Sequence, residues 1–152
     1  MENNYKEPFV IDGGIAVDDR GSLLFANTFD FKGIKRFYAV ENFSTETVRA
    51  FHGHLKEAKY ALVISGTAIV AAVKMDDTQK PNKSNKVNRF VLSDKKPSIL
   101  YIPAGFANGF RFLTQKGKII FFSTSTTEES KGDDYRFSAD YWGKEIWEVV
   151  DR

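Results

Sequence analysis

Short β-prone runs bounded by turn residues dominate this sequence, and helical patterns are nearly absent from it. Polar or glycine-containing segments separate the runs, among them Ser65-Gly66-Thr67 and the loop 76–86. Only the tail, 141–150, is expected to form a short helical turn or a final strand. So many short strands predict an all-β fold of the jelly-roll or double-sheet barrel type. The expected strands are 21–27, 35–42, 47–54, 60–65, 68–74, 87–92, 98–102, 109–113 and 118–123.

Length and charge narrow the class of protein further. A chain of 152 residues fits one domain, so we expect a single domain over 1–152 with a core that needs no cross-links. The sequence contains no cysteine, which excludes disulfides, zinc–thiolate sites and cysteine nucleophiles. A net charge of +2 is too balanced for a protein that binds nucleic acid or acidic lipid.

The sequence also lacks the usual membrane and export signals. Residues 1–7 have neither a basic segment nor an apolar one, so no signal peptide is expected. The uncharged stretch 60–73 is interrupted by Gly66 and is too short for a membrane helix. We therefore expect a cytoplasmic protein without a membrane partner.

Both histidines of the chain lie in one expected strand, as His52-Gly53-His54. Residues two apart in a strand share a face, so the two rings should point to the same side. Removal of a proton next to a carbonyl needs a base of near-neutral pKa and a cation beside the enolate oxygen. His52 and Lys59 are suited to these two tasks. The structural alternative is that both histidines are hydrogen-bonded barrel residues and that Lys59 extends to solvent.

Two motifs resemble those of the cupin family. The spacing of His52, His54, Lys59 and Gly66 is that of the first cupin motif. The second motif is matched, in all but its last residue, by the run Pro103-Ala104-Gly105-Phe106-Ala107-Asn108. A metal-binding cupin carries glutamate where this chain has Lys59 and histidine where it has Asn108. Lysine repels a divalent cation and an amide is a poor ligand, so we expect neither a metal nor another cofactor.

A narrower resemblance covers about residues 17–147. It rests on Asp19-Arg20-Gly21, Arg49-Ala50-Phe51-His52, the run 102–110, and Phe137-Ser138-Ala139-Asp140 followed by Ile146-Trp147. These segments resemble the dTDP-4-dehydrorhamnose 3,5-epimerases and the related sugar-nucleotide 3,4-ketoisomerases. The resemblance implies a homodimer, a nucleotide-sugar substrate and a place in the synthesis of surface-polysaccharide sugars.

The same resemblance assigns roles to individual residues. It implies that His52 takes the proton from C3 of a 4-keto-6-deoxyhexose and that Asp140 holds the other ring nitrogen. Lys59 would stabilise the enolate oxygen. The remaining implied residues contact the nucleotide, the diphosphate or the sugar: Arg20, Arg49, His54, Asn108 and Tyr38.

The choice between the two reactions rests on a few positions. The 3,5-epimerases use a tyrosine after a late strand, whereas residues 121–129 here contain none, and Tyr38, Tyr60 or Tyr135 would have to replace it. The ketoisomerases carry a two-histidine motif like His52-Gly53-His54. The segments 35–38 and 134–136 of this chain also resemble the ketoisomerases. The run 102–110 favours an epimerase acting at C3 alone or at both C3 and C5, which is our first hypothesis. A 3,4-ketoisomerase and a sugar-binding cupin without activity are the alternatives.

Overall fold

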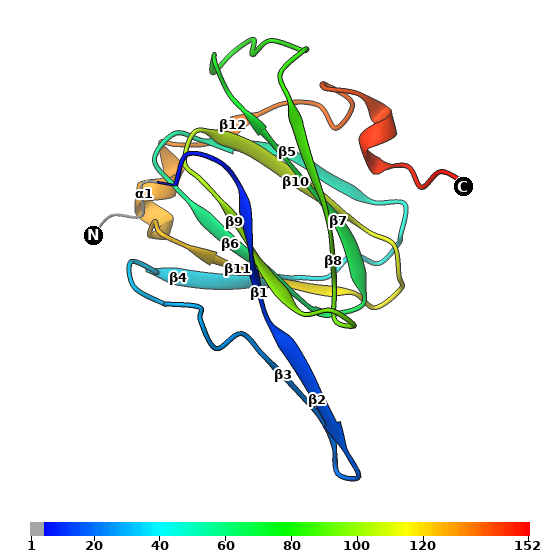
Figure 1. Cartoon of the computed structure of the whole chain (residues 1–152). Coiled ribbons are helices and arrows are strands. Elements are labelled where there is room, and N and C mark those ends of the chain that lie inside the picture. Colours follow the sequence, from blue (N-terminus) through cyan, green and yellow to red (C-terminus); the bar gives the residue numbers. More distant parts are fainter. Residues whose placement is uncertain (1–4) are drawn as a thin grey trace.

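The computed structural model describes residues 5–152. The first four residues of the expected domain, which belong to the segment where no signal peptide is expected, lie outside the described part. Two five-stranded antiparallel sheets face each other, and a separate hairpin projects from them (Figure 1). The first sheet has the order β1 (Phe9–Asp12), β9 (Ser98–Ile102), β6 (Lys59–Ser65), β11 (Lys118–Ser123) and β4 (Arg36–Val40). The second has the order β12 (Tyr135–Arg136), β5 (Val48–His54), β10 (Phe106–Phe112), β7 (Thr67–Lys74) and β8 (Val87–Ser93).

Three smaller elements complete the described chain. The projecting hairpin is formed by β2 (Gly14–Asp18) and β3 (Gly21–Phe25). The short helix α1 (Thr127–Lys131) follows β11, and a 3₁₀ helix (Lys144–Trp147) lies near the C-terminus.

Apolar side chains from both sheets fill the space between them. Val63, Leu100 and Ile102 of the first sheet pack with Val70 and Phe112 of the second, and all five are nearly inaccessible to solvent. Burial of such side chains is the main contribution to stability in a sandwich of this kind. The all-β, double-sheet architecture predicted from the sequence is therefore confirmed.

The C-terminal segment covers the outer face of the second sheet. Phe51 of β5 packs there against Trp142, with ring centroids 4.8 Å apart, and against Trp147. Since neighbouring residues in a strand point to opposite faces, Phe51 facing outward turns His52 inward. The tail thus fixes which face of β5 is available to a site between the sheets.

The expected strands are all present, with ends that differ by a few residues. The elements that were not expected are β1, β2, α1 and β12. The helix α1 could have been predicted from the sequence, because Thr126 and Glu129 have the spacing of a capping box and form one at its first turn. β12 is only two residues long and pairs with β5, a tertiary contact that local sequence does not encode.

Gly109 lies where β10 passes close to β5. A Cβ atom at this position would contact the Cβ of Ala50 and lie 2.7 Å from the Ala50 Cα atom. We predict that Gly109→Ala lowers the free energy of unfolding by about 1–3 kcal/mol, because the backbone would have to move apart. Denaturant unfolding measures this, with Gly132→Ala as the control, since nothing lies within 4 Å of its added Cβ. Equal stabilities of the two variants would contradict the packing described.

Candidate active site

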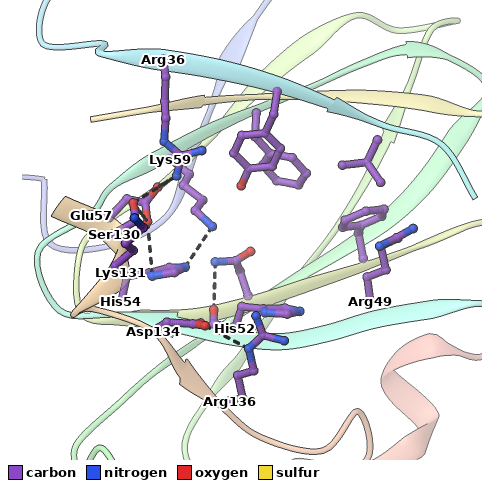
Figure 2. A pocket seen from close by; sticks show the side chains of 15 residues that line it. Arg36, Arg49, His52, His54, Glu57, Lys59, Ser130, Lys131, Asp134 and Arg136 are labelled. Atoms are coloured by element: carbon purple, nitrogen blue, oxygen red, sulfur yellow. Dashed lines mark hydrogen bonds and ion pairs between the residues drawn. The ribbon is translucent and has the colours of Figure 1, made fainter. Parts of the chain in front are cut away.

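A cavity of about 480 Å³ opens between the two sheets. Its walls combine strands of both sheets with α1 and the β12 segment (Figure 2). Charged side chains gather at one end of it, around Glu57, whereas Arg49 lies at the other end. The lining residues are Arg36, Tyr38, Val40, Arg49, His52, His54, Glu57, Lys59, Asn108, Phe110, Phe121, Ser130, Lys131, Asp134 and Arg136.

The second sheet contributes both histidines. His52 and Asn108 are paired across β5 and β10, and the Asn108 amide donates a hydrogen bond of 3.2 Å to the His52 carbonyl oxygen. The His52 ring is half-buried and makes no hydrogen bond with any described residue. His54, two residues on, is buried and has partners on both ring nitrogens. The two histidines therefore line one pocket in different states.

The first sheet contributes a buried lysine and an aromatic pair. Lys59 Nζ lies 3.0 Å from His54 Nε2, so this contact joins the two sheets. The Tyr38 ring stacks on Phe121, with centroids 5.3 Å apart, and Lys59 Nζ is 5.8 Å from the Tyr38 centroid. Tyr38 is the tyrosine that lines the pocket among the described residues. Tyr60 and Tyr135 instead pack in clusters on the outer faces of the sheets.

A buried ionic network supports this end of the pocket. The Glu57 side chain is fully buried and accepts hydrogen bonds from Ser123 Oγ and, at 3.1 Å, from Arg36 Nη2. Its second oxygen lies 3.3 Å from Ser130 Oγ and 3.2 Å from His54 Nδ1. Sequence reasoning did not place Glu57 or Arg36 among the site residues. Arg36 could have been found, because it lies two residues from Tyr38 in an expected strand and so shares its face.

Two predicted site residues lie away from the pocket. Asp140 is exposed and is not among the pocket-lining residues, because the segment that carries it crosses the outer face of the second sheet. The expected pairing of Asp140 with the His52 ring is therefore wrong in this structure. The carboxylates that line the pocket are those of Glu57 and Asp134.

Arg20 lies in the projecting hairpin and pairs with Asp18, with 86% of its side chain exposed. Arg20 lines a separate hollow on the hairpin. It does not line the pocket between the two sheets. The predicted contact of Arg20 with substrate is thus not formed within one chain. Arg49 does line the pocket, and its Nε donates a 2.6 Å hydrogen bond to Asn42 Oδ1.

The electrostatics of the pocket favour neutral imidazoles. Burial lowers the pKa of His52, and the positive charges of Arg136 and Lys59 lower it further. Burial and Lys59 likewise lower the pKa of His54. A histidine with a lowered pKa remains an unprotonated base at neutral pH. Burial raises the pKa of Tyr38, so its phenol keeps its proton.

The donor set of the pocket does not suit a metal ion. The ammonium group of Lys59 lies on His54 Nε2, the nitrogen that a metal would need, and repels a cation there. Within residues 5–152, no group of three or more histidine, cysteine or acidic side chains is arranged to hold a metal.

The same residues include no helix that is long and apolar enough to cross a membrane.

The fold and the paired histidines define a cupin. The model of the dTDP-4-dehydrorhamnose 3,5-epimerase family matches residues 3–140, and the chain belongs to this family. A comparison with curated proteins finds no match.

Solved structures of similar fold include both kinds of isomerase. The rmlC epimerase of Mycobacterium tuberculosis has a TM-score of 0.72 and 16% identity, over 98% of this chain and 76% of that one. ChmJ, a 3′-monoepimerase from Streptomyces bikiniensis in complex with dTDP-quinovose, has a TM-score of 0.72 and 12% identity, over 90% and 72%. QdtA, a sugar 3,4-ketoisomerase from Thermoanaerobacterium thermosaccharolyticum in complex with TDP, has a TM-score of 0.65 and 18% identity, over 90% and 93%.

The pKa values of the histidines can be tested directly, because the chain has only two. We predict titration midpoints below the ordinary value of 6.5 for both rings. Arg136→Gln should raise the midpoint of His52, because it removes a positive charge and frees the negative charge of Asp134. His54 should move less. NMR titration measures both midpoints, with the exposed Arg152→Gln as control. A His52 midpoint that Arg136→Gln leaves unchanged would contradict this electrostatic account.

Proposed function

We propose that this protein is a metal-independent epimerase of a dTDP-linked 4-keto-6-deoxyhexose and that His52 removes the proton at C3. The observation that carries the proposal is the placement of His52 on one sheet and of Lys59 and Tyr38 on the other, all lining one pocket. A sugar held between the sheets would meet a base on one side and two proton-bearing groups on the other. Inversion at carbon requires such an arrangement of base and acid on opposite faces.

The first step follows from the state of each group. The unprotonated His52 ring, free of hydrogen bonds with the described residues, takes the C3 proton. The electron pair of the C3–H bond moves into the carbonyl and leaves negative charge on O4. The ammonium group of Lys59 stabilises this oxyanion, and its buried position strengthens the interaction.

The second step returns a proton to C3 from the other side. Tyr38 has a protonated phenol in the pocket and comes from the sheet opposite His52. Donation of this proton to C3 restores the 4-keto group with inverted configuration. The phenolate and the His52 imidazolium then exchange protons with solvent, which regenerates the starting state.

The far end of the pocket suits the nucleotide part of the substrate. Arg49 presents a guanidinium group there, which is held by Asn42, and such groups bind phosphate oxygens well. ChmJ and a QdtA variant have been solved with dTDP-quinovose and TDP-4-keto-6-deoxyglucose, which supports a ligand of this class. Asn108 and His54 complete the sugar end of the proposed site.

A 3,4-ketoisomerase is the second candidate, favoured by the His52-Gly53-His54 motif and by the similarity to QdtA. It would begin with the same removal of the C3 proton but would deliver a proton to C4, and its product would carry the keto group at C3. The engagement of both His54 ring nitrogens argues against this residue as a second mobile acid.

Turnover of TDP-4-keto-6-deoxyglucose in deuterated water tests the proposal. We expect deuterium at C3, an inverted C3 configuration and a retained 4-keto group, all detectable by NMR and mass spectrometry. His52→Asn should slow the exchange by about 100-fold or more. Tyr38→Phe should still exchange the C3 proton but should return it without inversion.

Other outcomes of the same experiment exclude the proposal. A 3-keto product would assign the ketoisomerase reaction. Binding of the substrate without exchange, in a folded preparation, would assign a sugar-binding protein without activity. Full exchange by His52→Asn would remove His52 from the role of base.

We further propose a cytoplasmic homodimer that acts in the synthesis of surface-polysaccharide sugars. The support for the dimer is the hairpin β2–β3, which projects from the sheets (Figure 1) and carries exposed apolar residues. Val17 is 74% and Leu23 66% exposed. Such residues on a projecting hairpin favour contact with a second copy, and Arg20 would then belong to that interface.

Two acidic substitutions in the hairpin test the dimer. We predict that Val17→Asp with Leu23→Asp converts a dimer into a monomer, because the charges would have to be buried in the interface. Light scattering after size-exclusion chromatography measures the mass. The matched control is Val149→Asp with Val150→Asp, two valines of similar exposure at the C-terminus. A wild-type monomer at micromolar concentration, or a dimer in the hairpin variant, would contradict the proposal.

A further inference from the structure

Glu57 lies at the charged end of the pocket wall, in the turn between β5 and β6, and has no part in the steps proposed above. A fully buried carboxylate is costly unless hydrogen bonds satisfy it. Here donors reach both of its oxygens. They come from β4, β5, β11 and α1, namely Arg36, His54, Ser123 and Ser130. Glu57 therefore connects four elements around one negative charge.

The partners of His54 determine its tautomer. Nδ1 lies 2.5 Å from the carbonyl oxygen of Asp133 and 3.2 Å from the Glu57 carboxylate, and both of these groups only accept hydrogen bonds. Nδ1 must therefore carry the ring proton. Nε2 is then the unprotonated nitrogen, and it accepts a hydrogen bond from Lys59 Nζ at 3.0 Å. His54 is occupied on both sides, in contrast to His52.

Lys59 depends on this arrangement for its position and its charge. Burial lowers its pKa, and the negative charge of Glu57 is the largest opposing influence. A neutral amine could not stabilise an oxyanion as an ammonium group does. The titratable and charged groups that face Lys59 are His52, His54, Glu57, Arg36, Tyr38, Asp133 and Asp134.

We propose that Glu57 is a positioning residue that acts through His54 on Lys59. The carboxylate fixes the orientation of the His54 ring, whose Nε2 holds the ammonium group of Lys59 at the pocket wall, and it supplies the charge that balances that ammonium. His54 is thus a fixed acceptor and does not abstract a proton. The catalytic consequence of this chain rests on the proposed epimerase function, whereas its structural part does not.

The tautomer of His54 is tested on the wild-type protein. Long-range ¹H–¹⁵N NMR distinguishes the two ring nitrogens, and His52→Asn assigns the signals because the chain has only two histidines. We expect a protonated Nδ1 and an unprotonated Nε2 for His54 at neutral pH. A protonated Nε2 on His54 would overturn the proposal. This measurement needs no substrate, so it stands even if the protein proves not to be an epimerase.

Glu57→Gln tests the effect on Lys59. Loss of the negative charge should lower the pKa of Lys59 further, which ¹⁵N NMR of the lysine Nζ groups would detect. With turnover, the alkaline limb of the pH–rate profile should move down by the same amount, and kcat should fall roughly tenfold with a smaller change in KM. Glu57→Asp keeps the negative charge, so the pKa of Lys59 and kcat in this variant should lie between those of Glu57→Gln and those of the wild type.

The matched control is Glu41→Gln, which makes the same change at an exposed ion pair with Lys118. It should leave the titration of Lys59 unchanged. An unshifted Lys59 titration in folded Glu57→Gln would overturn the proposal. If Glu57→Gln does not fold, Glu57→Asp decides, because its shorter side chain withdraws the carboxylate from His54 Nδ1. A Lys59 titration midpoint below that of the wild type, measured by ¹⁵N NMR, supports the proposal, and an identical midpoint contradicts it.

Discussion

The contact between Lys59 and His54 is the interaction on which the pocket depends. It joins the two sheets at the charged end of the cavity, where both side chains are buried. A buried ammonium group is stable only if its charge is balanced and its protons are accepted. Glu57 supplies the balancing charge, and Arg36 in turn pairs with Glu57. These charged side chains therefore form one connected network, and we expect substitution of any one of them to affect the others.

The alternation of side chains along β5 places His52, whose ring has no hydrogen bond with the described residues, in the same pocket as the Lys59–His54 contact. Phe51 points outward into the cluster under the C-terminal tail, and His52 consequently faces the pocket. His54 faces the same way but is bound by Lys59 and the Asp133 carbonyl. Two histidines of the same motif thus have different capacities: one ring can accept a proton from a ligand, and the other holds a cation in place.

The strands were predicted well from the sequence, because side-chain alternation and turn residues are local signals. The inward placement of His52, His54 and Lys59 in one pocket followed from motif spacing. The site residues that were missed or misplaced depend on tertiary contacts. Asp140 was assigned through a short degenerate segment, and the tail that carries it packs on the outer face of the second sheet. Glu57 was missed, because its four partners come from elements as distant in sequence as residues 36 and 130.

The most direct test of the account is a crystal structure of the His52→Asn variant with TDP-4-keto-6-deoxyglucose. The account predicts that C3 of the sugar faces residue 52 and that O4 lies at hydrogen-bond distance, about 3 Å, from Lys59 Nζ. The nucleotide should extend toward Arg49. A complex in which the sugar turns C3 away from residue 52, or in which O4 makes no contact with Lys59, would contradict it.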